Sequence, residues 1–100
     1  MNGPVLSTEL DDPSAVPYFL WDEPMTSSEF RERIRAASES ERVRLLSKLL
    51  REARDTEVWK FTDLAEVLRF WPRIRMQLGR RRTFWEFLLE SWRREGLLGG

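Results

Sequence analysis

The chain contains no cysteine and no histidine. Without cysteine it can form neither disulfide bonds nor thiolate metal sites, and this composition is typical of a reducing compartment. Without histidine it lacks the side chain that most often acts as a general base near neutral pH or as a zinc ligand. We therefore expect a cytoplasmic protein without a metal site.

Glycine is scarce, and its positions exclude a phosphate-binding loop. The five glycines are Gly3, Gly79, Gly96, Gly99 and Gly100. This spacing contains no Gly-rich loop of the kind that holds nucleotide phosphates. Most acidic residues fall at positions that a helix would turn to solvent, and we find no carboxylate pair placed for acid–base catalysis. We expect a protein that is not an enzyme and needs no cofactor.

Long apolar runs are also missing. Nowhere do about 18 apolar residues follow one another, as a membrane-spanning helix would require, and residues 1–6 lack the basic and apolar regions of a secretion signal. A chain of 100 residues corresponds to one domain, because chains divide into several cores only at greater length. We expect one domain that has no membrane-spanning segment.

The net charge is zero, but the charges are unevenly distributed. Residues 1–25 carry five acidic side chains and no Lys or Arg, whereas residues 69–82 carry six arginines and no acid. Residues 1–16 also contain Pro4 and Pro13 and show little periodicity, a composition that orders poorly on its own. This pattern predicts a flexible acidic tail over residues 1–16 and a single helical domain over residues 17–98.

Residues 17–24 begin and end with proline and enclose four consecutive large apolar side chains. Because proline discourages a helix on either side, the segment is expected to be extended. It has two interpretations: it lies across its own domain and completes the core, or it docks on a partner protein. In the second interpretation the contact residues are Tyr18, Phe19 and Trp21.

Capping-box patterns predict the start of two helices. Thr26 precedes Glu29 by three positions, and Ser38 precedes Glu41 in the same way, so each hydroxyl and carboxylate can satisfy an amide of the first helical turn. Apolar positions at helical spacing follow both patterns. We predict helices that begin at these two sites.

The second half of the chain predicts further short helices. Apolar spacing indicates helices from near residue 62 to residue 71 and over residues 80–95, with an extended connector at residues 58–61. Pro72 is expected to begin a separate short helix that ends at Gly79, because proline is favoured at the first helical position and glycine just after the last. The predicted fold is all-α, an irregular bundle of four to five short helices with an extended N-terminal segment.

Arginines gather around the start of the last predicted helix. The candidate partner-binding arginines are Arg73, Arg75, Arg80, Arg81 and Arg82. Positive charge is unfavourable at a helix N-terminus because the helix dipole is positive there. Glu86, the acidic tail, phosphate groups or an acidic surface on a partner could compensate it.

Aromatic side chains surround much of the same helix. One face carries Trp85, Leu88, Leu89 and Trp92, and Phe84 and Phe87 flank it. Either the N-terminal segment or a partner must cover one of these flanks. Since Trp and Arg are enriched at interface hot spots, this surplus is the main reason to expect a protein partner.

We therefore predict a non-catalytic protein-binding module. One alternative is a nucleic-acid-binding regulator that uses the arginine cluster, although zero net charge and apolar residues over 84–92 are untypical of a DNA-recognition helix. The other alternative is a self-associating structural protein that forms a homo-oligomer.

Three stretches carry a resemblance to a known group of proteins: residues 17–22 (PYFLWD), 45–55 (LLSKLLREARD) and 79–89 (GRRRTFWEFLL). Together they resemble small bacterial helical proteins that are often encoded beside nucleotidyltransferase toxins of the abortive-infection type. The likeness spans residues 17–98. It implies an antitoxin, or an accessory partner, of such a toxin, and it assigns no functional residues.

Overall fold

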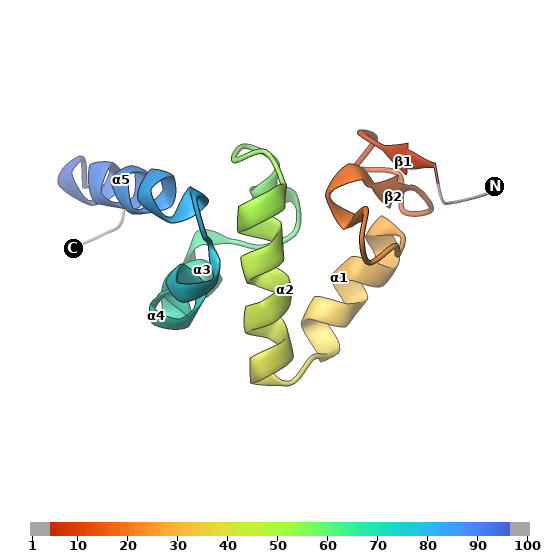
Figure 1. Ribbon diagram of the computed structural model, residues 1–100, viewed down its shortest axis with the longest axis horizontal. Coiled ribbons are helices and arrows are strands. Elements are labelled where there is room, and N and C mark those ends of the chain that lie inside the picture. Colours follow the sequence, from red (N-terminus) through yellow and green to blue (C-terminus); the bar gives the residue numbers. More distant parts are fainter. Residues whose placement is uncertain (1–4, 97–100) are drawn as a thin grey trace.

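The computed structural model describes residues 5–96 and shows a mainly helical fold (Figure 1). The α-helices are α1 (Ser27–Ala36), α2 (Glu39–Glu52), α3 (Leu64–Arg69), α4 (Trp71–Ile74) and α5 (Arg81–Arg94). Single 3-10 turns are η1 (Tyr18–Leu20), η2 (Val58–Lys60) and η3 (Arg75–Gln77). The expected all-α class is confirmed, with one small strand pair added near the N-terminus.

The helix starts follow the capping signals in the sequence. Thr26 and Glu29 form the full reciprocal capping box of α1. At α2 only half of the predicted box forms: the Ser38 hydroxyl accepts from the Glu41 amide at 3.2 Å, whereas the Glu41 carboxylate pairs with Arg44 instead. Both predicted starts are correct, because a single capping hydroxyl is enough to satisfy one of the first helical amides.

Pro72 and Gly79 interrupt the chain where the sequence predicts. α3 ends at Arg69, and α4 begins one residue before Pro72, which lies in its first turn. The expected helix over residues 72–78 is split into α4 and the 3-10 turn η3. Gly79 follows with a φ of +55°, in the left-handed region that glycine adopts without steric cost.

The predicted extended connector at residues 58–61 is wrong. Successive backbone bonds three residues apart join Glu57 to Arg54, Lys60 to Glu57 and Phe61 to Val58, which makes η2. A lone strand here would leave these amides without partners. Local 3-10 turns satisfy them and also bury Val58 and Phe61.

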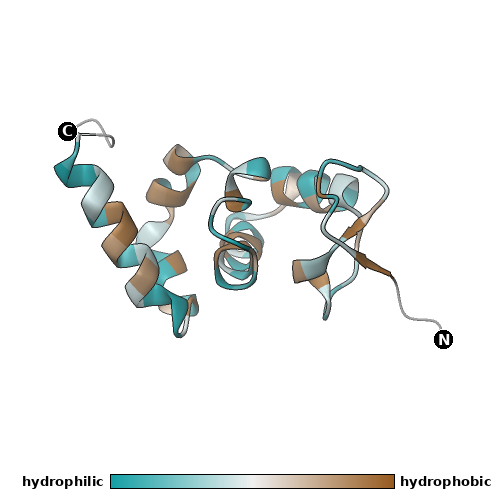
Figure 2. Cartoon of the chain, turned by 90° about the horizontal axis from the view of Figure 1, so that it is seen from above, coloured by the Kyte–Doolittle hydropathy of each residue, from teal (hydrophilic) through white to brown (hydrophobic). Residues whose placement is uncertain are grey.

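α2 is the central helix of the fold, with α1 on one side and α3, α4 and α5 on the other (Figures 1 and 2). Its buried side chains cover most of its circumference: Val43, Leu45, Leu46, Leu49 and Leu50. Ser47 and Lys48 are buried as well, so burial extends beyond the apolar stripe, and a helix that is buried on several sides needs neighbours on several sides. This explains why the other elements are arranged around α2.

Residues 5–16, expected as a mobile tail, pack on the domain. β1 (Leu6–Ser7) pairs in parallel with β2 (Val16–Pro17), and Leu10 in the loop between them is only 2% exposed. The amide of Ser27 at the start of α1 donates to the Ala15 carbonyl at 2.9 Å. The described part of the chain therefore shows no boundary at residue 17. Residues 1–4 of the expected tail, and residues 97 and 98 of the expected domain, lie outside the described residues.

The described chain measures 48 × 26 × 23 Å, and the N-terminal segment and α5 lie at opposite ends of the longest axis (Figure 1). α2 separates them in both views (Figures 1 and 2). The N-terminal segment therefore does not cover α5, and the two candidate surfaces of the sequence analysis are not continuous.

Candidate protein-binding surface

Residues 17–24 contribute more to the core of the domain than to an exposed surface on which a partner could dock. Phe19 is 1% exposed, and its ring packs edge-on against Phe30 and Phe61. Trp21 is 60% exposed and is the only one of the three candidate contact residues here whose side chain lies largely in solvent. Phe19 is thus a core residue and not a contact residue.

Tyr18 is half-buried and joins the N-terminal segment to the end of α2. Its hydroxyl donates to a Glu57 carboxylate oxygen at 2.5 Å and accepts from the Arg54 amide at 2.8 Å. Burial and the Glu57 hydrogen bond raise the pKa of the Tyr18 hydroxyl. These two bonds explain Tyr18 as a structural residue, because its polar group is already satisfied within the chain.

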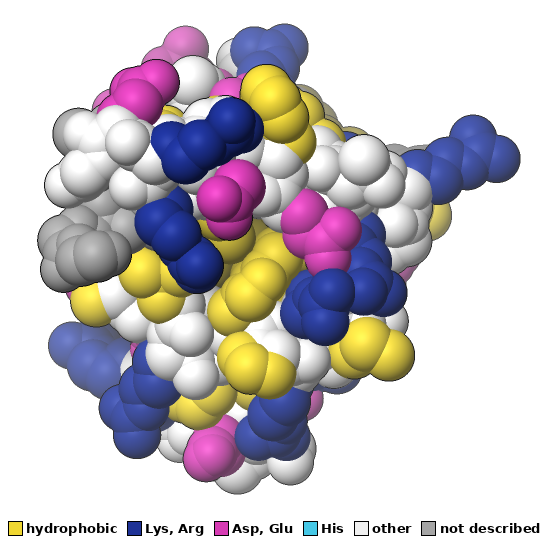
Figure 3. All heavy atoms as spheres, turned by 90° about the vertical axis from the view of Figure 1, so that its left-hand side faces the viewer, with side chains coloured by type: hydrophobic (Ala, Val, Ile, Leu, Met, Phe, Trp, Pro, Cys, Tyr) yellow, Lys and Arg dark blue, Asp and Glu magenta, His cyan; other side chains and the backbone are white. Residues whose placement is uncertain are grey.

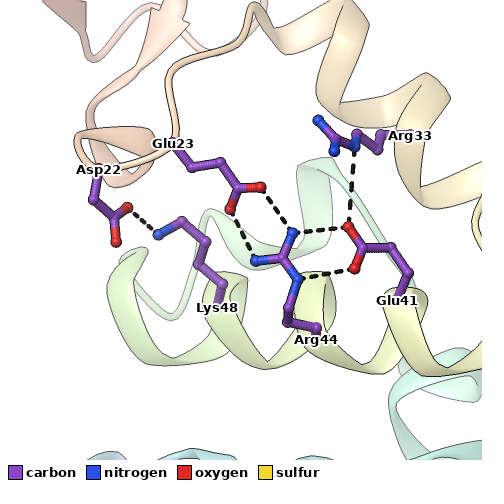
Figure 4. Close-up of polar contacts among 6 residues, drawn as sticks. All are labelled: Asp22, Glu23, Arg33, Glu41, Arg44 and Lys48. Atoms are coloured by element: carbon purple, nitrogen blue, oxygen red, sulfur yellow. Dashed lines mark hydrogen bonds and ion pairs between the residues drawn. The ribbon is translucent and has the colours of Figure 1, made fainter.

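Two acids of the segment bind cations of α2 (Figure 4). Asp22 pairs with Lys48, whose side chain is only 4% exposed. Glu23 accepts two hydrogen bonds from Arg44, at 3.0 and 2.7 Å, and the same guanidinium also binds Glu41. The Arg44 guanidinium holds the pKa of Glu23 below its usual range. The two acidic side chains of the segment therefore pair with cations of α2 and not with the arginine cluster.

Most of the arginine cluster is also paired within the chain. Arg75 and Arg82 both donate to one oxygen of Glu86, at 2.7 and 3.0 Å, and together they lower the pKa of that carboxyl. Arg73 lies 3.6 Å from a carboxylate oxygen of Glu39. The compensation that the helix start requires therefore comes largely from carboxylates of the chain itself.

Two arginines of the cluster differ from the others. The Arg81 guanidinium lies over the Phe84 ring, 5.0 Å from its centroid. Arg80 is exposed and has no ion-pair partner among residues 5–96. These two side chains carry the positive charge that remains available at the start of α5.

α5 is attached to the domain along one side by tryptophan. Trp85 is fully buried, and its indole N–H donates to the Leu50 carbonyl at 2.9 Å. That carbonyl belongs to the last turn of α2, whose terminal carbonyls have no partner within the helix. Trp59 packs against both Trp85 and Trp92, with ring centroids 6.0 Å apart in each pair.

The flank of α5 beside this attachment carries exposed aromatic side chains. Phe87 is 64% exposed and Phe84 is 38% exposed, and Leu88, one turn after Phe84, is half-buried against the core. Figure 3 shows this end of the molecule, where hydrophobic side chains are exposed among arginines and acids. We call Phe84, Phe87 and Leu88 the α5 face. The aromatic surplus of this helix is visible in the sequence, and the spacing of Phe84 and Phe87 places them on one flank, but neither is among the predicted contact residues.

A polar recess of about 500 Å³ lies between α1 and residues 61–66. Arg31 donates to the Lys60 carbonyl and stacks over Phe61 there, and Arg42 donates to the Ile34 carbonyl at the end of α1. Both guanidinium groups thus have structural roles, and the recess has no group that requires a ligand.

The described residues contain no group of three acidic side chains that could hold a metal ion. Within the same part of the chain, every helix is too short or too polar to cross a membrane. Comparison of the chain with protein-family models, with curated proteins and with solved structures found no match.

Proposed function

We propose that this chain is a non-catalytic protein-binding module and that its contact surface is the α5 face. The observation that carries the proposal is the exposure of Phe84 and Phe87 on one flank of a helix whose other flank is already buried. Because Trp85 and Leu89 attach the helix to the core, folding does not need the second flank. Exposed aromatic side chains that folding does not need are typical of an interaction surface.

Trp21 gives weaker support for a second contact surface. It is a single exposed aromatic residue whose neighbours Phe19 and Leu20 are buried. Isolated apolar side chains are common on protein surfaces and need no partner to explain them. We therefore place the interface at α5 and not at residues 17–24.

The nucleic-acid alternative has less support than a protein partner. Arg73, Arg75 and Arg82 would have to leave Glu39 or Glu86 before they could bind phosphate. An apolar partner surface requires no such loss, because it would cover Phe84 and Phe87 as they stand.

The resemblance in the sequence makes a nucleotidyltransferase-type toxin the first partner to test, and in that case the chain would act as an antitoxin. The test is co-expression of the tagged chain with the toxin encoded beside it, followed by size-exclusion chromatography. We expect one complex with the unchanged chain and loss of the complex with Phe87→Ser.

Trp21→Ser is the matched control, because Trp21 is nearly as exposed as Phe87 and belongs to the N-terminal segment, which lies on the other side of α2 from α5. We expect this variant to keep the complex. Separate elution of the unchanged chain and the toxin would contradict the antitoxin assignment. A complex that survives Phe87→Ser but is lost with Trp21→Ser would move the interface to residues 17–24.

A further inference from the structure

The α5 face belongs to a longer stripe along the exposed side of α5. Arg80, Phe84, Phe87, Ser91 and Arg94 are spaced four, three, four and three positions apart. This spacing places side chains on one flank of a helix, and it is the spacing by which two helices pack side by side. Phe84 and Phe87 remain 38% and 64% exposed, so the rest of the described chain leaves the stripe open to a second helix.

The charges along the stripe differ between its two ends. The start of α5 is basic, because Arg80 and Arg81 have no ion-pair partner in the described part of the chain. The end of α5 carries both signs, since Glu90 and Glu95 lie within four positions of Arg94. Glu90 is exposed and forms no ion pair with another described residue. A helix that covers the stripe should therefore place an acid beside the start of α5, and α5 itself carries such an acid near its end.

The stripe is complementary to itself in an antiparallel pair of α5 helices. When Phe84 of each copy lies opposite Phe87 of the other, Arg80 lies opposite Ser91, because each is four positions farther along its helix. Ser91 is small and leaves room for the guanidinium, and Glu90 is its neighbour in the sequence. Arg80 and Glu90 are both on the side of the stripe where Phe87 lies, and a two-fold pair brings this same side of each helix together. Each aromatic contact and each ion pair therefore forms twice.

The other charges beside the stripe are compatible with this arrangement. On the opposite side of the stripe, Arg81 of each copy lies within about 8 Å of Glu95 of the other along the helix axis. Arg94 is one turn after Glu90, so it extends past Arg80 of the other copy. A parallel pair would instead place every charge of the stripe opposite itself, and facing like charges are destabilising.

We propose that the α5 face binds a second copy of this chain, in an antiparallel pair of α5 helices that places Phe84 against Phe87 and Arg80 against Glu90. α5 lies at one end of the longest axis, so a second copy can approach without meeting the N-terminal segment (Figure 1). A contact through one helix of 14 residues per chain is small, and small interfaces are typical of weak complexes. This inference rests on the proposed function, because it uses the same contact surface, and the dimer would have to open before that surface could bind a toxin.

The first experiment is sedimentation equilibrium of the full chain over a range of concentrations. We expect a monomer–dimer equilibrium with a dissociation constant in the micromolar range. Phe87→Ser should weaken the dimer at least about tenfold, because one substitution removes two rings from a symmetric contact. A chain that remains monomeric at every concentration, or a dimer that Phe87→Ser leaves unchanged, would overturn the inference.

Two charge reversals test the antiparallel arrangement. Arg80→Glu brings acids together, and Glu90→Arg brings arginines together, so each variant alone should form a dimer about tenfold weaker than the unchanged chain does. An equimolar mixture of the two variants should restore the dimer, because both ion pairs of the mixed dimer again join opposite charges. Both substitutions are at exposed positions, and circular dichroism checks that each variant folds. A mixture that associates no more tightly than either variant alone would overturn this arrangement.

Arg93→Glu is the matched control. Arg93 is exposed and lies nine positions after Phe84, which places it on the opposite side of the helix. Its substitution should change the dissociation constant by less than about twofold. An effect as large as that of Arg80→Glu would show that net charge, and not the contact between Arg80 and Glu90, controls association, and would overturn the arrangement.

The co-expression test of the proposed function gives a separate result. If the chain is monomeric but forms a toxin complex that Phe87→Ser abolishes, the α5 face binds another protein and the present inference is wrong. If the chain forms the antiparallel dimer and elutes apart from the toxin, the antitoxin assignment is wrong and the present inference stands.

Discussion

At the scale of single residues, Trp85 performs two tasks at once: it fills the core and it satisfies a terminal carbonyl of α2. We predict that Trp85→Phe lowers the free energy of unfolding by about 1–3 kcal/mol, since the Leu50 carbonyl loses its donor and the smaller ring leaves unfilled space. Chemical denaturation followed by circular dichroism measures the change. Trp21→Phe, at an exposed position, should change it by less than about 0.5 kcal/mol.

The pairing of Glu23 with Arg44 predicts a dependence of stability on pH. The pKa of Glu23 is lowered from the ordinary value of 4.5, so the Glu23 carboxylate takes up a proton at a higher pH in the unfolded chain than in the folded chain. The stabilisation is therefore present above pH 4.5 and is lost as the pH falls through the lower folded pKa. For a partly exposed pair it amounts to about 0.5–1 kcal/mol.

Glu23→Gln should lower the free energy of unfolding at neutral pH and flatten its decrease below about pH 4.5. Denaturant titrations at several pH values give both quantities. Glu52→Gln is the control, because among residues 5–96 Glu52 pairs only with Arg51, its neighbour in the sequence. An equal flattening in both variants would contradict the role given to the contact between Glu23 and Arg44.

The burial of individual residues in 17–24 could be predicted only in part. The run of apolar side chains correctly indicates that the segment contributes to the core, as Phe19 and Leu20 do. It could not indicate which members are buried, because an extended segment alternates its side chains whereas η1 turns them differently. That choice depends on contacts with Glu57 and Arg54, which are distant in the sequence.

At the scale of elements, the turn before α5 depends on Gly79. Its φ of +55° lies in the left-handed region, and an added Cβ would meet no atom within 4 Å. We therefore predict that Gly79→Ala costs about 1–2 kcal/mol from backbone conformation alone. Thermal unfolding should show a smaller loss for Gly79→Asn, because asparagine tolerates this conformation better. Equal stability of the alanine variant would contradict this account.

Helix starts and stops were largely predictable because their causes are local. Thr26, Ser38, Pro72 and Gly79 each act on the backbone within a few residues, and the structure places a boundary at or beside each of them. The connector at 58–61 was not predictable in this way. Its apolar residues have strand propensity, but a strand needs a neighbour that the fold does not provide.

At the scale of the whole molecule, the N-terminal residues belong to the folded unit. Leu10 is buried although polar residues surround it in the sequence. We predict that Leu10→Ala lowers the free energy of unfolding by about 2–4 kcal/mol, as expected for a core leucine. Val5→Ala, at an exposed position, should have little effect. Equal stability of the Leu10 variant in denaturant titrations would support a mobile tail after all.

The composition of residues 1–16 could not reveal this packing. Local polarity and proline content argue for disorder, whereas a single buried leucine and a two-residue strand pair act over long distances. The α5 face could be predicted more readily, since the spacing of Phe84 and Phe87 is visible in the sequence. What the sequence could not show is that the N-terminal segment lies at the other end of the molecule and leaves this face uncovered.

Because Asp22 and Lys48 are in contact, chemical modification of Lys48 can report when residues 17–24 detach from α2. The chain has two lysines, and the Lys48 side chain is 4% exposed whereas that of Lys60 is 40% exposed. An amine-acylating reagent should modify Lys60 first and should reach Lys48 mainly while residues 17–24 are lifted from α2. The ratio of the two modified peptides in a mass spectrum would then measure how often this segment detaches, alone and in the presence of a partner.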